Sequence, residues 1–294
     1  MIQLSNTKDV FLLSLKKYNA KKNPAPFFIL LVTASANAQY YFKDIISNKQ
    51  MIADMTAYKE NKVRTITLKS FEDNGSESEG FFCEKKLSRD YRKAELFTRA
   101  DIAPASLFTS IFDKDGMLLI TKDSSDLSVT DIVYTYDDKR RIASVISHIK
   151  SNDDDFINII SQEHIYTYNE NNQPEKMILV KNKKDSTIIL FGYDDNGNVS
   201  IEKDTKNGTK FFYYYDSKKN LTDIVQANEY SKRLKPDYVF GYNSAGKITQ
   251  MTAVEEGSNN YFIWKYTYDN GLRIKEKCFT NEKRLMGSIE YEYK

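Results

Sequence analysis

One pattern of apolar and polar positions recurs along more than half of the chain, and its clearest copy runs from Phe191 to Ile201. Phe191 and Tyr193 are two residues apart, so their side chains point to one face of an extended strand. Asp194 can accept hydrogen bonds from backbone N–H groups two residues on. Gly197 can take the positive φ that closes a short hairpin loop. The pattern predicts a strand, a tight turn and a returning strand.

The pattern is repeated from about residue 112 to the end of the sequence. The second aromatic residue of each copy stands at Phe112, Tyr136, Tyr168, Tyr193, Tyr215, Tyr242, Tyr268 and Tyr293. Asp or Asn follows it in every complete copy, at Asp113, Asp137, Asn169, Asp194, Asp216, Asn243 and Asp269. Glycine comes four positions after the aromatic residue at Gly116, Gly197 and Gly246. The spacing predicts successive antiparallel hairpins joined by short turns.

The pattern aromatic-x-Tyr-Asp/Asn-x-x-Gly-x-aliphatic resembles the YD repeats of the Rhs and teneurin-type β-shell proteins. The likeness covers roughly residues 106 to 294. It implies an architecture of hairpins and no particular activity, because the motif encodes a turn between two strands. The copies are unevenly spaced, and residues such as Arg140 and Lys219 replace the glycine. We therefore expect a shorter curved sheet and not a large shell closed around cargo.

The residues before the repeats predict one helix and further strands. Apolar residues recur at roughly helical spacing in the segment 44–60, and from Val63 the period changes to two. The expected fold is all-β: a large curved antiparallel β-meander of YD-like hairpin repeats with one N-terminal helix, in about fifteen to eighteen strands. Its expected parts are a leader over 1–38, a helical segment over 39–61 and the meander over 62–294.

The segment 21–38 is typical of an export signal. Two lysines precede the apolar run 27–32, and Ala36 and Ala38 form an Ala-x-Ala site, so we predict cleavage between Ala38 and Gln39. The run is too short to anchor a chain in a bilayer. We expect an exported protein, periplasmic or extracellular, that does not span a membrane once the signal is removed. A buried helix of the mature domain is the alternative interpretation of the run.

Composition and charge limit the partners. The chain has 294 residues, 13% of them aromatic, which is ample material for a core. Its net charge is +2; five lysines and one aspartate in the first 38 residues contribute +4, which leaves −2 for the rest. Nothing in this balance favours nucleic acid as a partner.

The sequence predicts no catalytic, cofactor or metal site. The turn from Asp113 to Gly116 superficially resembles a calcium loop but lacks the distal glutamate, so we interpret it as an ordinary turn. His148 and His164 are the only histidines, and neither has a metal-ligand spacing, so we expect solvated or turn-proximal positions. There is no Gly-x-Ser-x-Gly motif and no phosphate-binding glycine loop. We expect a protein that is not an enzyme.

The two cysteines, Cys83 and Cys278, leave two alternatives. In an exported chain they could form a disulfide, provided that the ends of the sheet approach each other. They could equally be free thiols buried on sheet faces, where cysteine packs as a small apolar residue.

The tyrosines raise the question of carbohydrate binding. Phe262, Trp264, Tyr266 and Tyr268 have equal parity and share one face of a strand, opposite Lys265 and Thr267. This arrangement favours a ladder of core side chains over an exposed platform for sugar rings.

Three functional hypotheses follow. The first is a non-catalytic exported β-repeat protein that acts as an envelope scaffold or interaction module, with an unknown envelope protein or glycan as its partner. The alternative is a periplasmic or surface carrier that binds a glycan or lipid on the concave face of the sheet. A third, an outer-membrane barrel, is disfavoured because strands such as 199–204 and 273–277 carry too much charge for a lipid-facing side.

Overall fold

The computed structural model describes residues 39–101, 103–152, 159–227, 235–254 and 260–294. The expected leader over 1–38, including Ala38 at the predicted cleavage position, lies outside the described residues. Gln39 is the first residue described.

The described residues form one helical segment followed by eighteen strands. The helical segment consists of η1 (Tyr41–Ile46), which is π-helical, and α2 (Ser47–Glu60). The strands are β1 (Thr65–Glu72), β2 (Phe82–Leu87), β3 (Lys93–Ala100), β4 (Ala103–Phe112), β5 (Leu118–Ser125), β6 (Ser128–Tyr136), β7 (Ile142–Ser151), β8 (Ile159–Tyr168), β9 (Pro174–Lys181), β10 (Asp185–Tyr193), β11 (Val199–Asp204), β12 (Lys210–Tyr215), β13 (Leu221–Ala227), β14 (Lys235–Tyr242), β15 (Ile248–Val254), β16 (Tyr261–Asp269), β17 (Leu272–Thr280) and β18 (Leu285–Tyr293).

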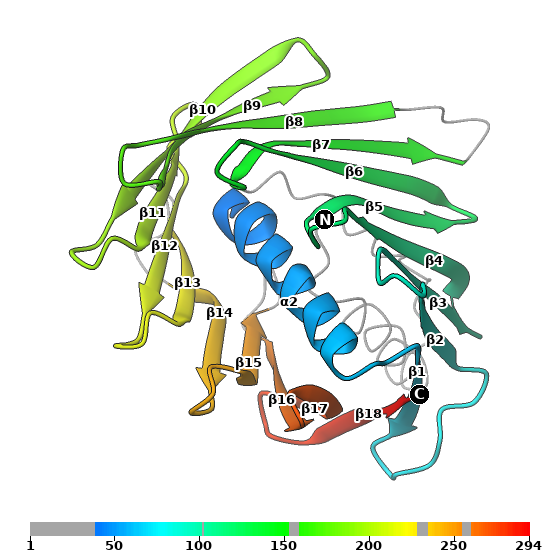
Figure 1. The fold of residues 1–294 in the computed structure, drawn as a ribbon. Coiled ribbons are helices and arrows are strands. Elements are labelled where there is room, and N and C mark those ends of the chain that lie inside the picture. Colours follow the sequence, from blue (N-terminus) through cyan, green and yellow to red (C-terminus); the bar gives the residue numbers. More distant parts are fainter. Residues whose placement is uncertain (1–38, 102, 153–158, 228–234, 255–259) are drawn as a thin grey trace.

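The sheet is a closed antiparallel barrel. Each strand pairs with the next, and β18 also pairs with β1, in a register that runs from Ile66 opposite Tyr293 to Glu72 opposite Gly287 (Figure 1). The all-β antiparallel prediction is confirmed, but the expected open curved meander is wrong. Each pair of twisted strands rotates the sheet a little further, and closure provides pairing partners for both sheet edges.

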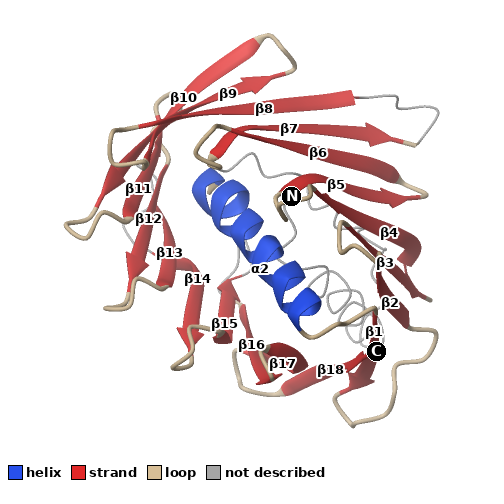
Figure 2. Ribbon diagram, viewed as in Figure 1, coloured by secondary structure: helices blue, strands red, loops and turns tan. Residues whose placement is uncertain are grey.

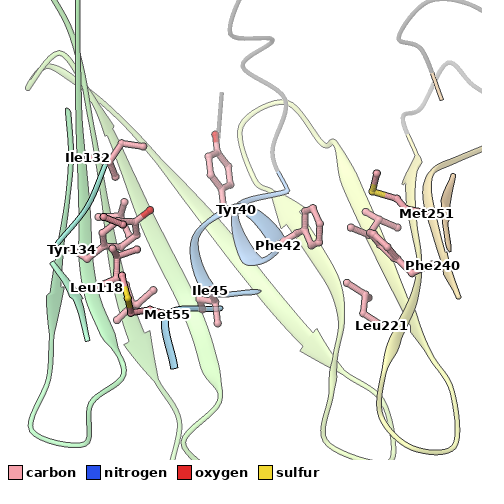
Figure 3. Close-up of a cluster of buried hydrophobic side chains, with 14 of the residues drawn as sticks. Tyr40, Phe42, Ile45, Met55, Leu118, Ile132, Tyr134, Leu221, Phe240 and Met251 are labelled. Carbon is pink, nitrogen blue, oxygen red and sulfur yellow. The ribbon is translucent and has the colours of Figure 1, made fainter. Parts of the chain in front are cut away.

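The helical segment runs through the interior of this barrel (Figure 2). Its apolar side chains pack against opposite walls. Figure 3 shows Ile45 and Met55 toward Tyr134 on one side, while Phe42 faces Phe240 on the other, with ring centroids 5.8 Å apart. The barrel interior is therefore a packed core around a helix. The strands alternate and turn their apolar side chains inward, and the helical segment covers these side chains.

The aromatic ladder of β16 faces inward, as expected. Trp264 is 3% exposed, and Phe262 and Tyr266 pack against the same core. The first aromatic residue of each repeat pair is likewise a core residue, at Tyr134, Tyr166, Phe191, Tyr213 and Phe240.

Cys83 and Cys278 are both buried, and they are not joined by a disulfide. The sheet does bring its two ends together, but Cys83 lies on β2 and Cys278 on β17, with β1 and β18 between them. Three interstrand spacings of about 4.8 Å separate the two backbones by about 14 Å. A disulfide requires Cα atoms within about 7 Å, so the disulfide alternative does not fit this barrel.

Among the described residues, no helix has the length and apolar character needed to cross a membrane.

Candidate functional site

The repeated Asp and Asn residues close the tight turns. In the copy at Tyr193, Asp194 Oδ1 accepts hydrogen bonds from the backbone N–H groups of Asn196 at 3.0 Å and Asn198 at 2.8 Å. The same pair of bonds is made by Asp113, Asp137, Asn169, Asp216 and Asn243. These side chains satisfy backbone donors of their own turns.

The position four residues after the aromatic residue has positive φ whether or not it is glycine. The φ values are 80° at Gly116, 61° at Arg140, 61° at Asn172, 78° at Gly197, 65° at Lys219 and 74° at Gly246. The turn geometry is thus kept where the glycine is lost. Asp269 begins a shorter turn, in which Asn270 and Gly271 have φ values of 47° and 77°, as a two-residue hairpin loop requires.

The repeat tyrosines have a second role that sequence reasoning missed. The hydroxyl of each one donates to a backbone carbonyl in the preceding hairpin. These bonds join Tyr136 to Leu118, Tyr168 to Ile142, Tyr193 to Pro174, Tyr215 to Val199, Tyr242 to Leu221, Tyr268 to Ile248 and Tyr293 to Arg273. Each tyrosine therefore links one hairpin to the one before it. The identity of the residue, Tyr in place of Phe in all copies after the first, was the available signal.

A buried polar cluster holds the helical segment against β8. Asp44 is fully buried, and its Oδ2 lies 2.6 Å from Nδ1 of His164 and accepts a hydrogen bond from the hydroxyl of Tyr166 at 2.7 Å. The expectation of a solvated or turn-proximal His164 is wrong, because this residue is 6% exposed and faces the interior. His148 is exposed. Among the described residues, His164 Nε2 has no hydrogen-bond partner.

A second buried carboxylate holds the start of the helical segment. Glu202 on β11 is 0% exposed. Its Oε1 accepts from the backbone N–H groups of Gln39 at 2.8 Å and Tyr40 at 3.0 Å, and its Oε2 accepts from the N–H of Tyr41 at 2.9 Å and the hydroxyl of Tyr213 at 2.8 Å. Burial raises the pKa of Glu202, and the hydrogen bonds from these four groups oppose the increase. No pattern in the sequence predicts this contact.

The helix leaves a cavity of about 380 Å³ on one side of the barrel interior. The cavity lies between α2 and strands β1–β3 and β14–β18, and reaches the tight turns at Gly246 and Gly271. Its aromatic and apolar lining includes Tyr58, Tyr266, Tyr268, Tyr291, Tyr293, Met51, Ile66, Leu68, Leu96, Phe240, Ile248, Met251 and Leu272. The tyrosines that sequence reasoning placed in the core thus also form the wall of a cavity.

Three cationic residues line this cavity: Lys85, Lys247 and Arg273. The Arg273 guanidinium lies 4.3 Å from the ring centroid of Tyr266 and donates from Nη1 to Glu276 at 3.2 Å, so its charge is balanced. The ammonium of Lys85 lies 5.4 Å from the ring centroid of Tyr58 and makes no ion pair with a described residue. Burial lowers the pKa of Lys85. Lys247 lines the cavity beside the tight turn at Gly246, so Lys85 and Lys247 are the two lining cations for which the described residues provide no ion pair.

A second cavity, of about 280 Å³, lies on another side of the helical segment near the tight turns. Lys49, Arg140 and Arg141 line it. Arg141 stacks over Tyr168 at 4.2 Å and is paired with Asp137. Within the described ranges, no group of three or more His, Cys, Asp or Glu side chains could hold a metal ion.

Comparisons with known proteins add little to this geometry. No protein-family model matches the sequence, and no curated protein matches it. The crystal structure of TcdB2-TccC3-TEV has 13% identity and a TM-score of 0.32, with 73% of this chain and 12% of that chain covered. A porin-like protein from Bacteroides uniformis has 12% identity and a TM-score of 0.36, with 79% and 98% covered. At these TM-scores the likeness assigns neither a family nor a function.

Proposed function

We propose that the chain is an exported, non-catalytic carrier of the periplasm or cell surface, and that its plugged barrel binds a small amphipathic ligand with an acidic group. The cavity of about 380 Å³ beside α2 is the observation that supports this most directly. Sites for small molecules usually measure about 300 to 1,000 Å³ and are mostly apolar. Export is supported by the leader sequence, and kinship with the YD-repeat proteins by the hairpin motif.

The lining favours a lipid-like acid over a glycan. The hydroxyls of Tyr268 and Tyr293 are already bonded to backbone carbonyls, so these residues offer mainly ring surface. Asp54 also lines the cavity, where its Oδ1 accepts from Gln50 at 2.8 Å. We assign the carboxylate or phosphate to Lys85, which lies beside the aromatic wall at Tyr58, since Arg273 is already paired and Lys247 lies at the tight-turn end of the cavity. An acyl chain would lie along the apolar wall, where few polar groups could hydrogen-bond a sugar.

Binding of cis-parinaric acid, a fluorescent fatty acid, tests this function on the exported protein. We expect saturable binding by the wild type. Lys85→Met should weaken binding of the acid about tenfold, which corresponds to about 1.4 kcal/mol for a lost charge-assisted contact. The methyl ester of the same fatty acid should bind both proteins equally, because it carries no charge for Lys85 to bind.

A cavity-filling variant separates the cavity from the rest of the surface. Ala53 lines the cavity from α2, so Ala53→Trp should abolish binding. Thr56 is exposed on the same helix and does not line the cavity, so Thr56→Trp is the matched control and should bind as the wild type does. Absence of saturable binding would reject the lipid carrier. Displacement of a bound ligand by oligosaccharides but not by fatty acids would favour the glycan carrier.

An envelope scaffold or interaction module is the second candidate, and one feature of the outer face favours it. Apolar side chains from neighbouring strands stand side by side there, in the row Ile165, Ile178 and Ile188 on β8, β9 and β10. Ile165 is 37% exposed and Ile188 is 46% exposed. Isolated exposed apolar residues are common, whereas a contiguous row is typical of a protein-binding surface.

Site-specific photo-crosslinking in the envelope tests the second candidate. A photoreactive residue at Ile188 should give one reproducible adduct with the same envelope protein. The same residue at Lys277, which is exposed on β17, should give none. Equal labelling from both positions, or no adduct from Ile188, would contradict a docking role for this row.

A further inference from the structure

The first described residue, Gln39, is held at both of its polar ends by carboxylates of the barrel wall. Its backbone nitrogen donates to Glu202 at 2.8 Å, and its side-chain Nε2 donates to Asp237 on β14 at 2.6 Å. Gln39 is 9% exposed. The same residue directly follows the Ala36-x-Ala38 site of the sequence.

Glu202 lacks the cation that a buried carboxylate normally has. It is fully buried and makes no ion pair with a described lysine, arginine or histidine. Three backbone N–H groups at the start of the helical segment and one tyrosine hydroxyl are its partners. Such donors stabilise an anion through partial charges. A full positive charge at the same place would stabilise the carboxylate further, because the interior screens charges weakly.

The backbone of Gln39 also suits a chain terminus better than an internal residue. Its φ is 88°. For a non-glycine residue this conformation crowds Cβ and the carbonyl oxygen of the preceding residue. Once the bond to residue 38 is cut, that preceding carbonyl is gone and the crowding disappears.

We propose that hydrolysis of the Ala38–Gln39 peptide bond by an export-signal peptidase is a maturation step that creates the cation for Glu202. Water adds to the Ala38 carbonyl carbon, the C–N bond breaks, the leader departs with a carboxylate, and Gln39 keeps its nitrogen as a protonated α-amine. The α-ammonium then forms a buried ion pair with Glu202 and fixes the helical segment inside the barrel. The inference shares the export step with the proposed function and is independent of any ligand.

The same geometry opposes a competing reaction of amino-terminal glutamine. In that reaction the α-amine attacks its own side-chain carbonyl carbon, the Cδ–Nε2 bond breaks, and ammonia leaves. The resulting ring carries no positive charge. Because Glu202 holds the nitrogen and Asp237 holds Nε2, we expect the mature chain to keep an uncyclised Gln39.

The first experiment determines the amino terminus of the exported protein. The full-length precursor is expressed in an exporting bacterial host, and the product is analysed by amino-terminal sequencing and intact mass. The expected product begins at Gln39 with a free amine. A chain that begins elsewhere, or one lighter by the mass of ammonia, would overturn the proposal. A fatty-acid binding assay on the same sample reads out the carrier function separately.

The second experiment measures the ion pair itself. The α-amine is labelled by ¹³C reductive methylation and titrated by NMR. The partner carboxylate should raise its pKa above the ordinary range of about 7.7 to 8.0. Glu202→Gln, which keeps a hydrogen-bond acceptor but removes the charge, should return the pKa to that range. Tyr213→Phe removes one neutral donor to Glu202 and should leave the pKa raised. An α-amine with an ordinary pKa in the wild type would overturn the ion pair.

A third measurement serves if Glu202→Gln fails to fold. A precursor with its cleavage site moved upstream yields an exported chain with two extra residues before Gln39, and Glu202 unchanged. Near pH 7 the wild type should unfold at a higher urea concentration than this extended chain. An amine with a raised folded pKa contributes stability below its unfolded pKa and loses that contribution as pH rises through its folded pKa. The two midpoints should therefore converge at high pH; equal midpoints near pH 7 would overturn the proposal.

Discussion

At the residue scale, two neighbouring residues of each repeat have separate roles. The aromatic residue packs in the interior and links hairpins, and the Asp or Asn after it closes the turn. The aromatic ring faces the interior, and the tyrosine hydroxyl bonds the carbonyl of the preceding hairpin. The next side chain, Asp or Asn, caps the turn. Because these contacts are local and repeated, each can be tested by a single substitution with a small and defined effect.

Removal of one repeat hydroxyl should cost a modest amount of stability. Tyr242→Phe removes the bond to the Leu221 carbonyl at 2.7 Å and should lower the free energy of unfolding by about 0.5 to 1.5 kcal/mol. Urea unfolding followed by fluorescence of Trp264, the single tryptophan, measures it. Tyr214 is 48% exposed on the outer face, so Tyr214→Phe is the control and should be near neutral. Equal effects of the two substitutions would refute the linking role of the hydroxyl.

At the positive-φ position of the turn, we expect glycine to be more stable than alanine because of backbone strain and not because of side-chain packing. Gly116 has a φ of 80°, and a Cβ there would meet nothing within 4 Å. Gly116→Ala should therefore lower the free energy of unfolding by about 1 kcal/mol through conformational strain. Gly241 has no positive φ, and its added Cβ would make only ordinary contact at 3.6 Å. Thermal or urea unfolding of Gly241→Ala should show no comparable loss; a loss of equal size would point to packing instead of φ.

At the element scale, polar groups decide how the helical segment sits inside the barrel. Asp44 bonds to β8 through His164 and Tyr166, and Glu202 of β11 holds the first residues of the segment. Apolar packing alone would tolerate small rotations of a helix in a barrel. Hydrogen bonds in a low-dielectric interior allow few arrangements, because an unmade bond there is costly.

Loss of the Asp44 carboxylate should destabilise the fold strongly. Asp44→Ala leaves His164 Nδ1 and the Tyr166 hydroxyl without their shared acceptor in the interior. The expected loss in the free energy of unfolding is about 2 to 6 kcal/mol, since each of the two buried unsatisfied groups costs about 1 to 3 kcal/mol. Thr56→Ala, on the exposed side of α2, should change it by less than about 0.5 kcal/mol. Denaturant titration of both proteins checks the difference, and similar losses would argue against the cluster as an anchor.

At the scale of the whole molecule, closure determines what is accessible. The β1–β18 seam joins residues from the two ends of the strand region, such as Ile66 and Tyr293. It turns the inner face into a closed interior, which holds the helical segment and the cavities of about 380 and 280 Å³. The exposed outer face carries the apolar row around Ile188.

The closed barrel should protect both thiols. Cys83 is 1% exposed and Cys278 is 0% exposed, and burial raises the pKa of Cys83 to about 11. Iodoacetamide at neutral pH should leave the folded protein unmodified and alkylate two thiols in denaturant, because reaction requires an accessible thiolate. Mass spectrometry of the non-reduced protein measures both states. A native mass lower by two protons, with no alkylation in denaturant, would show a disulfide and contradict this barrel.

The hairpins could be predicted from the amino-acid sequence alone. Aromatic residues two positions apart, an Asx side chain and a positive-φ position all act within about ten residues, so local physics is sufficient. It also predicted the inward ladder at Trp264, because parity sets the face of a strand.

Closure of the sheet into a barrel could not be predicted from local sequence patterns. Closure depends on twist accumulated over eighteen strands, and no single repeat carries that sum. In the closed barrel, two strands, β1 and β18, lie between the strands of Cys83 and Cys278. Closure also encloses a cavity lined by tyrosines that strand alternation had assigned to the core. The bond between Gln39 and Glu202 spans 163 positions. Such long-range contacts leave no local sequence pattern, because nothing near either residue in the sequence specifies its partner.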